Sequence, residues 1–315
     1  MKLLVLGAHG KLGSQVCEQL SKCHTVLGLG RAEADVTDIK ALFSAAESFG
    51  PEVIVNAAAW TDVDGCEVDQ DRAFLVNAIG ARNVALVARE VGAKLFYIST
   101  DYVFDGQKTS PYREYDSTAP VNFYGLSKLK GEEFVREQTP KHFILRVAWL
   151  YGSRGKDFLK TMLSLALTHH ELRVVNDQWG TPTCVDDVVR QIEVLMHTEL
   201  YGTYHCTAQG SCTWFEYALE IFKNLEYELS KCEDGVYEAK PSKQKGKGEI
   251  LRIRPVSSRE FPRPARRPRY SVLDNYLLRL QGLDVMPDWR EALKGFFDRL
   301  RSRGGIYEGL GLGRG

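Results

Sequence analysis

The glycine pattern at the start of the chain constrains the fold more than any other feature of the sequence. An apolar stretch over residues 3–6 is followed by Gly7, Gly10 and Gly13, and residues 11–20 have the apolar spacing of a helix. This pattern predicts a buried parallel strand, a tight turn and a helix. A glycine turn lets the backbone approach a phosphate, and a helix N-terminus offers unpaired N–H groups to its charge. We expect a phosphate-binding turn; an ordinary glycine-rich turn is the alternative, because such motifs also arise by chance.

The first half of the chain alternates strand patterns with helix patterns. Strands are predicted over residues 25–29, 53–56 and 94–99, and helices over residues 39–48 and 71–91. Repeated strand–helix–strand units predict an α/β fold with a Rossmann-like, doubly wound parallel sheet, whose ligands bind at the carboxyl ends of the strands. The residues at the ends of these strands should therefore converge in space, and they are Gly7, Arg31, Ala57, Ala58, Ala59, Ser99 and Thr100.

Arg31 follows the second predicted strand and bears on the choice of cofactor. A carboxylate near this position usually binds the ribose 2′-hydroxyl of NAD, whereas an arginine accommodates the 2′-phosphate of NADP. The nearest acid here is Glu33. The sequence therefore favours NADPH and leaves NADH open, with a solvated Arg31 that binds nothing as the alternative. Asp35 and Val36 begin a short stretch that could cap the next helix and touch the adenine.

Tyr124 and Lys128 form the strongest chemical signal. They lie four residues apart on a predicted helix and so share one face. A nearby ammonium stabilises a phenolate and lowers the pKa of the tyrosine, which makes the phenol a usable acid or base near neutral pH. The hydroxyl of Thr100, at the end of a predicted strand, could hold the oxygen that receives the proton. A tyrosine and a lysine at this spacing are common by chance. They become a specific signal here because they follow a glycine turn and a predicted strand that ends in Ser-Thr.

Composition disfavours several classes of function. The chain has 315 residues, with 41 lysines and arginines against 41 aspartates and glutamates, so net charge favours neither a nucleic-acid nor a membrane partner. No apolar run approaches the roughly 18 residues of a membrane span, and the apolar start leads into the glycine turn rather than a cleavage site. Seven cysteines without a Cys-x-x-Cys pair predict reduced thiols. With scattered histidines, we expect no metal, and we expect a cytoplasmic protein.

Five stretches resemble a known enzyme family. They are residues 53–59 (VIVNAAA), 99–106 (STDYVFDG), 120–128 (PVNFYGLSK), 145–152 (LRVAWLYG) and 177–183 (DQWGTPT). On these stretches the chain resembles the extended short-chain dehydrogenase/reductases, and within them the dTDP-4-dehydrorhamnose reductases. The resemblance spans nearly the whole chain. It implies NAD(P)H-dependent reduction of the C4 ketone of dTDP-4-dehydrorhamnose, a nucleotide sugar, to dTDP-L-rhamnose.

The resemblance also implies roles for individual residues. Thr100, Tyr124 and Lys128 would form the catalytic triad, with Tyr124 as the proton donor and Thr100 hydrogen-bonded to the substrate carbonyl. Lys128 would also hold the nicotinamide ribose. The pyrophosphate would contact Gly7, Gly10, Lys11, Leu12 and Gly13, the adenine Asp35 and Val36, the ribose Ala57, Ala58 and Ala59, and the sugar Thr100, Asp101, Tyr102 and Trp149.

The second half of the chain is less regular. Helices are predicted over residues 158–167, 185–196 and 214–225, and strands over residues 172–175 and 202–205. We expect a Rossmann domain over residues 1–148, to which segments near 170–206 return, and a smaller sugar-nucleotide-binding lobe over residues 149–302. The substrate would lie in the cleft between them.

Two segments depart from the family pattern. Residues 226–262 are longer and more polar than usual and predict a loop, in which the lysine-rich residues 243–248 would be flexible and solvated. An arginine from Arg252 onward could clamp the substrate's diphosphate. Residues 303–315 predict a flexible glycine-rich tail.

The first helix departs from the family in a residue that bears on metal binding. Some family members bridge subunits through magnesium bound by glutamates, one of them in the first helix. The chain has Ser14 and Gln15 in that region, which puts a metal in doubt. A homodimer is compatible with the resemblance.

Two other functions stay open. A sugar-nucleotide epimerase or 4,6-dehydratase would use the same scaffold, but a dehydratase of this superfamily has acids directly after the threonine, and here Asp101 is followed by Tyr102. A non-catalytic regulatory subunit is the other alternative, since residues 111–114 (PYRE) also resemble the β subunit of methionine adenosyltransferase. The intact triad favours an enzyme.

Overall fold

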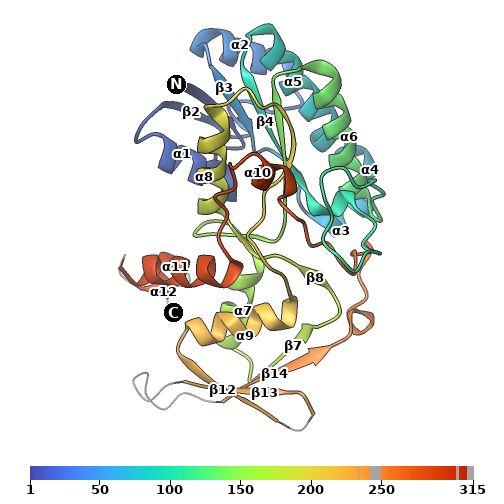
Figure 1. The fold of residues 1–315 in the computed structure, drawn as a ribbon, viewed down its shortest axis with the longest axis vertical. Coiled ribbons are helices and arrows are strands. Elements are labelled where there is room, and N and C mark those ends of the chain that lie inside the picture. Colours follow the sequence, from blue (N-terminus) through green and yellow to red (C-terminus); the bar gives the residue numbers. More distant parts are fainter. Residues whose placement is uncertain (233, 242–249, 303–304, 311–315) are drawn as a thin grey trace.

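The computed structural model describes residues 1–232, 234–241, 250–302 and 305–310. It has an upper and a lower lobe (Figure 1). The upper lobe contains a six-stranded sheet of order β10-β5-β4-β3-β1-β2, in which every pair is parallel. Its strands are β1 (Lys2–Leu6), β2 (Thr25–Leu29), β3 (Val53–Asn56), β4 (Lys94–Thr100), β5 (His142–Val147) and β10 (Gly202–His205). The predicted parallel sheet is confirmed.

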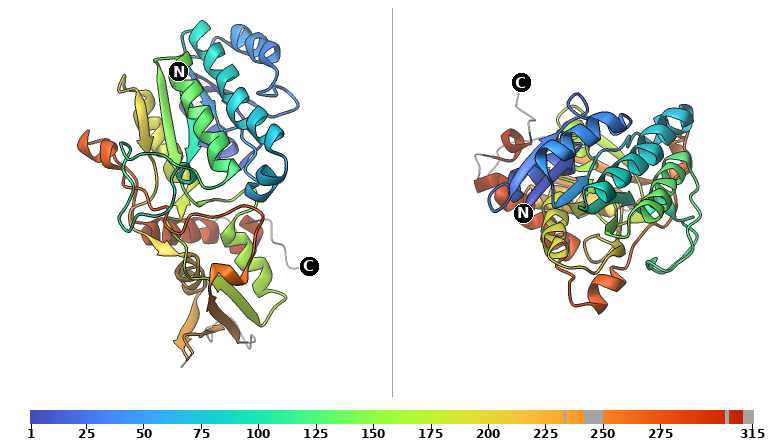
Figure 2. Two further views of the ribbon diagram at one scale, coloured as in Figure 1. Left: turned by 90° about the vertical axis from the view of Figure 1, so that its right-hand side faces the viewer. Right: turned by 90° about the horizontal axis from the view of Figure 1, so that it is seen from above.

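Helices cover both faces of this sheet, as Figures 1 and 2 show. One face packs against α1 (Lys11–Leu20), α8 (Val185–Met196) and α10 (Tyr276–Leu280), and the other against α2 (Ile39–Phe49), α5 (Gly80–Glu90) and α6 (Phe123–Gln138). The central strands are apolar throughout because successive side chains enter opposite cores: Leu3 and Val5 enter one, Leu4 and Leu6 the other. The sheet is therefore doubly wound.

The long helix predicted over residues 71–91 is interrupted. It consists of α4 (Gln70–Phe74), a π-helical turn η1 (Leu75–Ile79) and α5. Asn77 in this turn accepts a hydrogen bond from Trp60 N at 2.8 Å and donates one to Trp60 O at 3.1 Å. The widened turn thus fixes the loop that follows β3, between Asn56 and helix α3 (Val63–Val68).

The lower lobe contains a second sheet, of order β12-β13-β14-β7. Its strands are β7 (Glu171–Val175), β12 (Tyr227–Lys231), β13 (Tyr237–Pro241) and β14 (Leu251–Val256), and its helices are α7 (Phe158–Ala166), α9 (Trp214–Asn224), α11 (Trp289–Ser302) and α12 (Ile306–Gly309). Strand β7 pairs with β14 in parallel. The core of the lobe includes Phe222 from α9 and Trp289 and Phe297 from α11, all buried.

The prediction that residues 226–262 form a loop is wrong for three stretches, because they are strands β12, β13 and β14. Ala239, Leu251 and Ile253 are buried on one side of this sheet. These few apolar residues alternate with charged ones and are enough to order the strands. The lysine-rich residues 243–248 lie outside the described residues. In the predicted tail, Leu310 follows α12 and is buried.

Short elements complete the chain between and beside the lobes. They are the strand pairs β6 (Leu150–Tyr151) with β9 (Thr183–Cys184) and β8 (Trp179–Gly180) with β11 (Cys212–Thr213), and the 3-10 turns η2 (Asp101–Val103) and η4 (Ser258–Glu260). Among the residues described above, no helix has both the length and the apolar character needed to cross a membrane.

Candidate active site

Two cavities contain most of the residues that the sequence singles out. The first, here called the glycine cavity, has a volume of about 290 Å³ and lies at the carboxyl ends of β1, β2 and β3. Its walls are Gly7, His9, Gly10, Gly30, Arg31, Ala34, Asp35, Val36, Ala57, Ala58, Ala59, Trp60, Arg72 and Val76. The expected convergence of Gly7, Arg31 and the three alanines is therefore present, whereas Thr100 is not among its lining residues.

Close backbone packing explains two of the three glycines. Gly7 has φ +73°, and a Cβ there would lie 2.7 Å from Ala58 N. A Cβ on Gly13 would lie 2.2 Å from Gly7 O. Gly10 N donates to Gly7 O at 2.9 Å and is the N-cap of α1, which has no side-chain cap. The first N–H groups of α1 therefore stay free for an anion beside the cavity.

The side chains of Lys11 and Leu12 point away from the glycine cavity. Lys11 Nζ donates to Leu150 O at 2.8 Å and lies 3.6 Å from a carboxylate oxygen of Asp157. Leu12 is buried in the core beneath the sheet. With Gly13, these residues offer a ligand only their backbone N–H groups.

Arg31 is held at the cavity by Asp35. Its Nε lies 3.0 Å from Asp35 Oδ2, and its side chain is 76% exposed. Asp35 Oδ1 also accepts from Thr37 N at 2.9 Å. Burial raises the pKa of Asp35, but hydrogen bonds from Thr37 and Arg31 outweigh it, so the net pKa is lowered. Asp38, the last residue of the stretch that begins at Asp35, caps α2, so the predicted cap is confirmed.

Arg72 and Trp60 form a cation–π pair in the wall of the glycine cavity. The Arg72 Cζ lies 4.4 Å from the centroid of the Trp60 ring. Trp60 stands where the family pattern leads us to expect tyrosine or histidine. Arg72 comes from α4 and belongs to no motif, so only the fold places its charge here.

Tyr124 is brought against the end of β4 by a glycine contact. A Cβ on Gly125 would lie 2.1 Å from Tyr102 O, so the first turn of α6 packs directly on the backbone after Thr100. Asn122 caps this helix by accepting from Gly125 N at 2.8 Å. The rings of Tyr102 and Tyr124 lie edge to face, with centroids 6.1 Å apart. Thr100 and Tyr124 are within hydrogen-bonding reach of each other.

Burial decides the pKa of Tyr124. It raises that pKa, and a hydrogen bond with Thr100 lowers it by less. The prediction that Lys128 lowers the pKa of Tyr124 is wrong for this structure, because the Lys128 ammonium lies instead over the ring of Tyr97, 4.0 Å from its centroid. The phenol of Tyr124 therefore keeps its proton at neutral pH.

Lys128 is buried one turn along α6 from Tyr124 and is 2% exposed. Burial lowers its pKa to about 7, against the opposing charge of Glu132. Within the part of the chain that the structure describes, its ammonium donates no hydrogen bond; its partner there is the ring of Tyr97. A buried amine of this kind has its donors available for a ligand.

Glu132 anchors the helix that carries Tyr124 and Lys128. Its two oxygens accept from Arg146 Nε and Nη2 at 2.9 and 2.8 Å, and Ser99 Oγ donates to it at 2.6 Å. Burial raises the pKa of Glu132, but Arg146 outweighs it, so the net pKa is lowered. This buried ion pair joins α6 to β4 and β5 beside Thr100.

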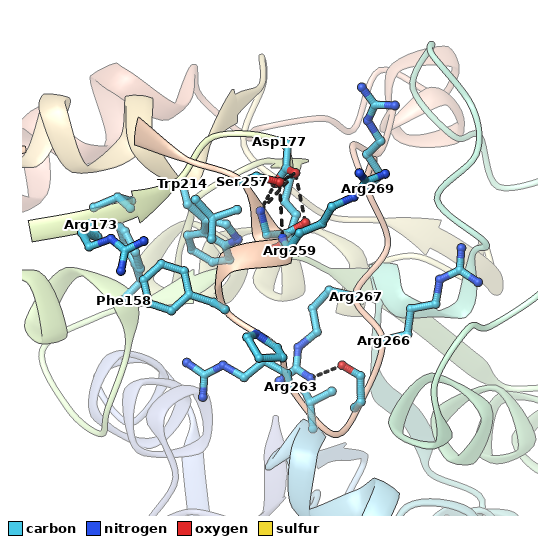
Figure 3. Close-up of a pocket in the computed structure, with 18 of the residues that line it drawn as sticks. Phe158, Arg173, Asp177, Trp214, Ser257, Arg259, Arg263, Arg266, Arg267 and Arg269 are labelled. Carbon is cyan, nitrogen blue, oxygen red and sulfur yellow. Dashed lines mark hydrogen bonds between the residues drawn. The ribbon is translucent and has the colours of Figure 1, made fainter. Parts of the chain in front are cut away.

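The second cavity, here called the arginine cavity, has a volume of about 1110 Å³ (Figure 3). Its walls include Tyr102, Phe158, Trp214 and six arginines, at positions 173, 259, 263, 266, 267 and 269. Arg173 pairs with Glu260, and Arg263 and Arg267 pair with Asp64. Among the described residues, Arg259, Arg266 and Arg269 have no carboxylate partner, which gives the cavity excess positive charge.

Trp149 does not line either cavity. It has φ 45° and stacks on Trp214, whose ring lines the arginine cavity. A Cβ on Gly180 would lie 2.3 Å from Trp149 Cε2, which explains the glycine in the Gln-Trp-Gly stretch. The sequence singles out Trp149, which supports the cavity wall, and misses Trp214, whose ring lines the cavity.

One group of potential metal ligands occurs among the described residues, away from both cavities. His24 Nε2 and His197 Nε2 lie 3.0 and 3.6 Å from Glu193 Oε1. The N-terminal ammonium of Met1 lies 3.3 Å from His24 Nδ1, and its charge opposes a cation there. The absence of a bound metal stays a prediction.

Comparison with known proteins decides the family. A family model described as the RmlD substrate binding domain matches residues 1–302. The chain belongs to this family. The match spans both lobes and both cavities, so the resemblance seen in the sequence is confirmed.

Relatives of this RmlD-family chain align over nearly their whole length. A dTDP-4-dehydrorhamnose reductase from Streptomyces griseus is 39% identical, over 96% of this chain and 95% of its own. A dTDP-4-keto-6-deoxy-D-glucose reductase from Streptomyces niveus is 36% identical, over 95% and 97%. The crystal structure of a dTDP-4-dehydrorhamnose reductase from Bacillus anthracis in complex with NADP is 41% identical, covers 95% of this chain and 99% of that chain, and has a TM-score of 0.85.

Proposed function

We propose that this chain is an NADPH-dependent reductase that converts the C4 ketone of dTDP-4-dehydrorhamnose into the hydroxyl of dTDP-L-rhamnose. Relatives with this named activity align over nearly the whole chain. The observation that carries the proposal is the buried Tyr124 beside Thr100, adjacent to Tyr102 in the wall of the arginine cavity. A protonated phenol beside a large, positively charged cavity supports reduction of a ketone in an anionic substrate.

The glycine cavity fits a dinucleotide. Its glycine turn leaves no room for side chains, and the uncapped N-terminus of α1 supplies free N–H groups for the pyrophosphate. We assign Asp35 and Val36 to the adenine, Ala57, Ala58 and Ala59 to the ribose, and Arg31 to the 2′-phosphate of NADPH. NADPH supplies the hydride for the reaction.

Tyr124 donates the proton in this proposal. Reduction of a ketone needs an acid that delivers a proton to the oxygen as the carbon receives hydride. The raised pKa of Tyr124 keeps its phenol protonated until the oxygen becomes basic. Thr100 hydrogen-bonds the same oxygen. The buried ammonium of Lys128 binds the nicotinamide ribose, because its donors have no other hydrogen-bond partner among the described residues.

The arginine cavity binds the nucleotide sugar in this proposal. Arg259, Arg266 and Arg269 supply positive charge for the diphosphate, and arginine suits bidentate hydrogen bonding to phosphate oxygens. Tyr102 contacts the sugar at the end of β4, where its side chain lines this cavity. Trp149 acts at this site through the ring of Trp214, on which it stacks.

The proposal is tested by following NADPH oxidation with enzymatically generated dTDP-4-dehydrorhamnose and identifying the product by mass and NMR. Rapid oxidation that yields dTDP-L-rhamnose supports it, with Tyr124→Phe as the control. If NADPH binds but is not consumed, the chain is not a reductase of this sugar, and a non-catalytic regulatory subunit becomes the better explanation.

A second candidate is a reductase of dTDP-4-keto-6-deoxy-D-glucose. The relative from Streptomyces niveus that bears this name is 36% identical, close to the value for the other relatives. The same assay with this D-sugar separates the two candidates, because the preferred substrate has the higher kcat/KM.

A further inference from the structure

Asp101 has an unusual environment for an aspartate. It directly follows Thr100 at the end of β4 and is 3% exposed. Its Oδ1 lies 3.0 Å from Thr100 Oγ1. Its Oδ2 is buried and has no hydrogen-bond partner among the described residues. Burying a carboxylate with one unpaired oxygen costs more free energy than burying the neutral carboxylic acid in the same place.

The hydrogen bonds of Thr100 can be counted. A threonine hydroxyl has one proton to donate and two lone pairs that accept. Tyr102 N–H donates to Thr100 Oγ1 at 3.2 Å and uses one lone pair. If Asp101 is ionised it only accepts, so it takes the single proton of Thr100. The hydroxyl then has no proton left for the oxygen of a ketone.

The count changes when Asp101 carries a proton. The carboxylic acid then donates to Thr100 Oγ1 and fills its second lone pair. The hydroxyl proton of Thr100 becomes free to point toward Tyr124, which is where the proposed function places the substrate oxygen. Both Thr100 and Tyr124 can then donate to that oxygen, as stabilisation of a developing alkoxide requires.

The surroundings of Asp101 favour the protonated form. Burial raises the pKa of Asp101 to about 7, and the hydroxyls of Thr100, which is hydrogen-bonded to Oδ1, and of nearby Ser271, which is not hydrogen-bonded to Oδ2, lower it by less. The titratable groups facing it are the phenols of Tyr124 from α6 and of Tyr102 from its own turn, both neutral at this pH. Arg267, the cation that acts on Tyr102, is paired with Asp64.

We propose that Asp101 is a positioning residue that, as a carboxylic acid, donates a hydrogen bond to Thr100 and so frees the Thr100 hydroxyl proton for the carbonyl oxygen of the substrate. The proposal rests on the proposed function, and it assigns Asp101 a role that acts through Thr100 rather than through sugar recognition. No proton leaves Asp101 during turnover. The proton consumed by reduction comes from Tyr124 and is replaced from solvent.

A pH profile of kcat/KM tests this role. Wild-type activity should fall about tenfold per pH unit once Asp101 ionises, with the break near its pKa of about 7. Asp101→Asn keeps a donor at every pH, so it should keep activity within about threefold of wild type at low pH and lose the break. Asp101→Ala removes the donor and should lose activity by on the order of a hundredfold at every pH.

Three outcomes would overturn the proposal. Asp101→Asn could retain the wild-type break, which would assign the titration to another group, such as Lys128, whose pKa burial also brings to about 7. It could also be inactive at all pH values while still binding NADPH and melting like wild type, which would mean that the carboxyl contacts the sugar directly. Equal activity of Asp101→Ala and wild type would show that no positioning is needed.

An infrared titration separates this proposal from the proposed function. The carboxylic-acid band of the wild type minus that of Asp101→Asn reports the proton on Asp101 without any substrate. A band present below neutral pH and lost above it supports the proposal, and its absence at every pH overturns it. If the wild type fails to reduce the keto sugar, the proposed function fails, and the infrared result still decides the state of Asp101.

Discussion

Trp149 and Trp214 lie face to face, with ring centroids 3.4 Å apart and planes 8° from parallel. One ring follows β5 of the upper lobe and the other begins α9 of the lower lobe. The stack therefore joins the two lobes at the wall of the arginine cavity, to which Trp214 contributes its ring.

Replacing Trp214 should weaken substrate binding. Trp214→Ala removes a ring from the cavity wall and takes away the stacking partner of Trp149. We expect the KM for the nucleotide sugar to rise about tenfold, because an aromatic pair contributes about 0.5–1.5 kcal/mol in addition to the burial of its surface area. The Kd of NADPH should stay unchanged. Trp214→Phe keeps a ring and should recover most of the loss. Steady-state kinetics and cofactor titration check this; a larger effect on NADPH than on the sugar contradicts it.

Replacing the phenol of Tyr124 should stop chemistry and spare binding. Tyr124→Phe keeps the buried ring but removes the proton donor, so turnover should fall by on the order of 10² to 10⁴. The Kd of NADPH, measured by fluorescence titration, should match the wild type. Turnover close to wild type would remove Tyr124 from the role of proton donor.

Arg31 should discriminate between the two nicotinamide cofactors. Arg31→Ala removes a guanidinium that Asp35 holds at the rim of the glycine cavity, so NADPH should bind about tenfold more weakly while NADH binding changes little. Arg89→Ala, which removes an exposed arginine paired with Glu90, is the matched control and should change neither. Equal losses for both cofactors would rule out the assignment to the 2′-phosphate.

Lys128 should make the stability of the protein depend on pH. Burial lowers its pKa to about 7 in the folded state, from an ordinary value of 10.5. Between these values the unfolded chain binds more protons than the folded one, so the free energy of unfolding should rise with pH across this window, by up to about 1.4 kcal/mol per unit. Lys128→Met has no proton to lose and should show a flatter dependence. Urea unfolding from about pH 7 to about pH 9 measures the difference; identical slopes would show that Lys128 titrates normally.

The upper lobe is largely predictable because its signals are local. Strands β2 and β3 and helices α1 and α8 have the bounds that the sequence predicts, since each is an apolar run or stripe between polar or glycine residues. The π-helical turn around Asn77 is invisible in the sequence, because it depends on a contact with the distant Trp60. The sequence does not reveal strands β12 to β14 for a similar reason. Their few buried residues stand among charged ones, and the strands are stabilised by pairing with one another and, through β14, with the distant β7.

The sequence predicts most of the residues of the candidate site but not their pKa values. The glycine turn, Arg31 and the three alanines meet because parallel strands end at one edge. The pKa of Tyr124 depends on how deeply its side chain is buried and on the direction of the Lys128 side chain. The four-residue spacing of the two residues predicts neither. Trp214 and Arg72 belong to no motif, and only the fold brings them to the cavities.

Strand β7 pairs with β14, which follows it by about 80 residues in the sequence. This separation sets the order in which the two lobes can fold as the chain leaves the ribosome. The six strands of the upper sheet are complete once residue 205 has emerged. The lower lobe must wait for β14 and for Trp289 and Phe297 of α11, near the end of the described chain. During synthesis, the upper sheet can thus form first, while the apolar side chains of α7 and α9 stay uncovered until β14 and α11 have emerged.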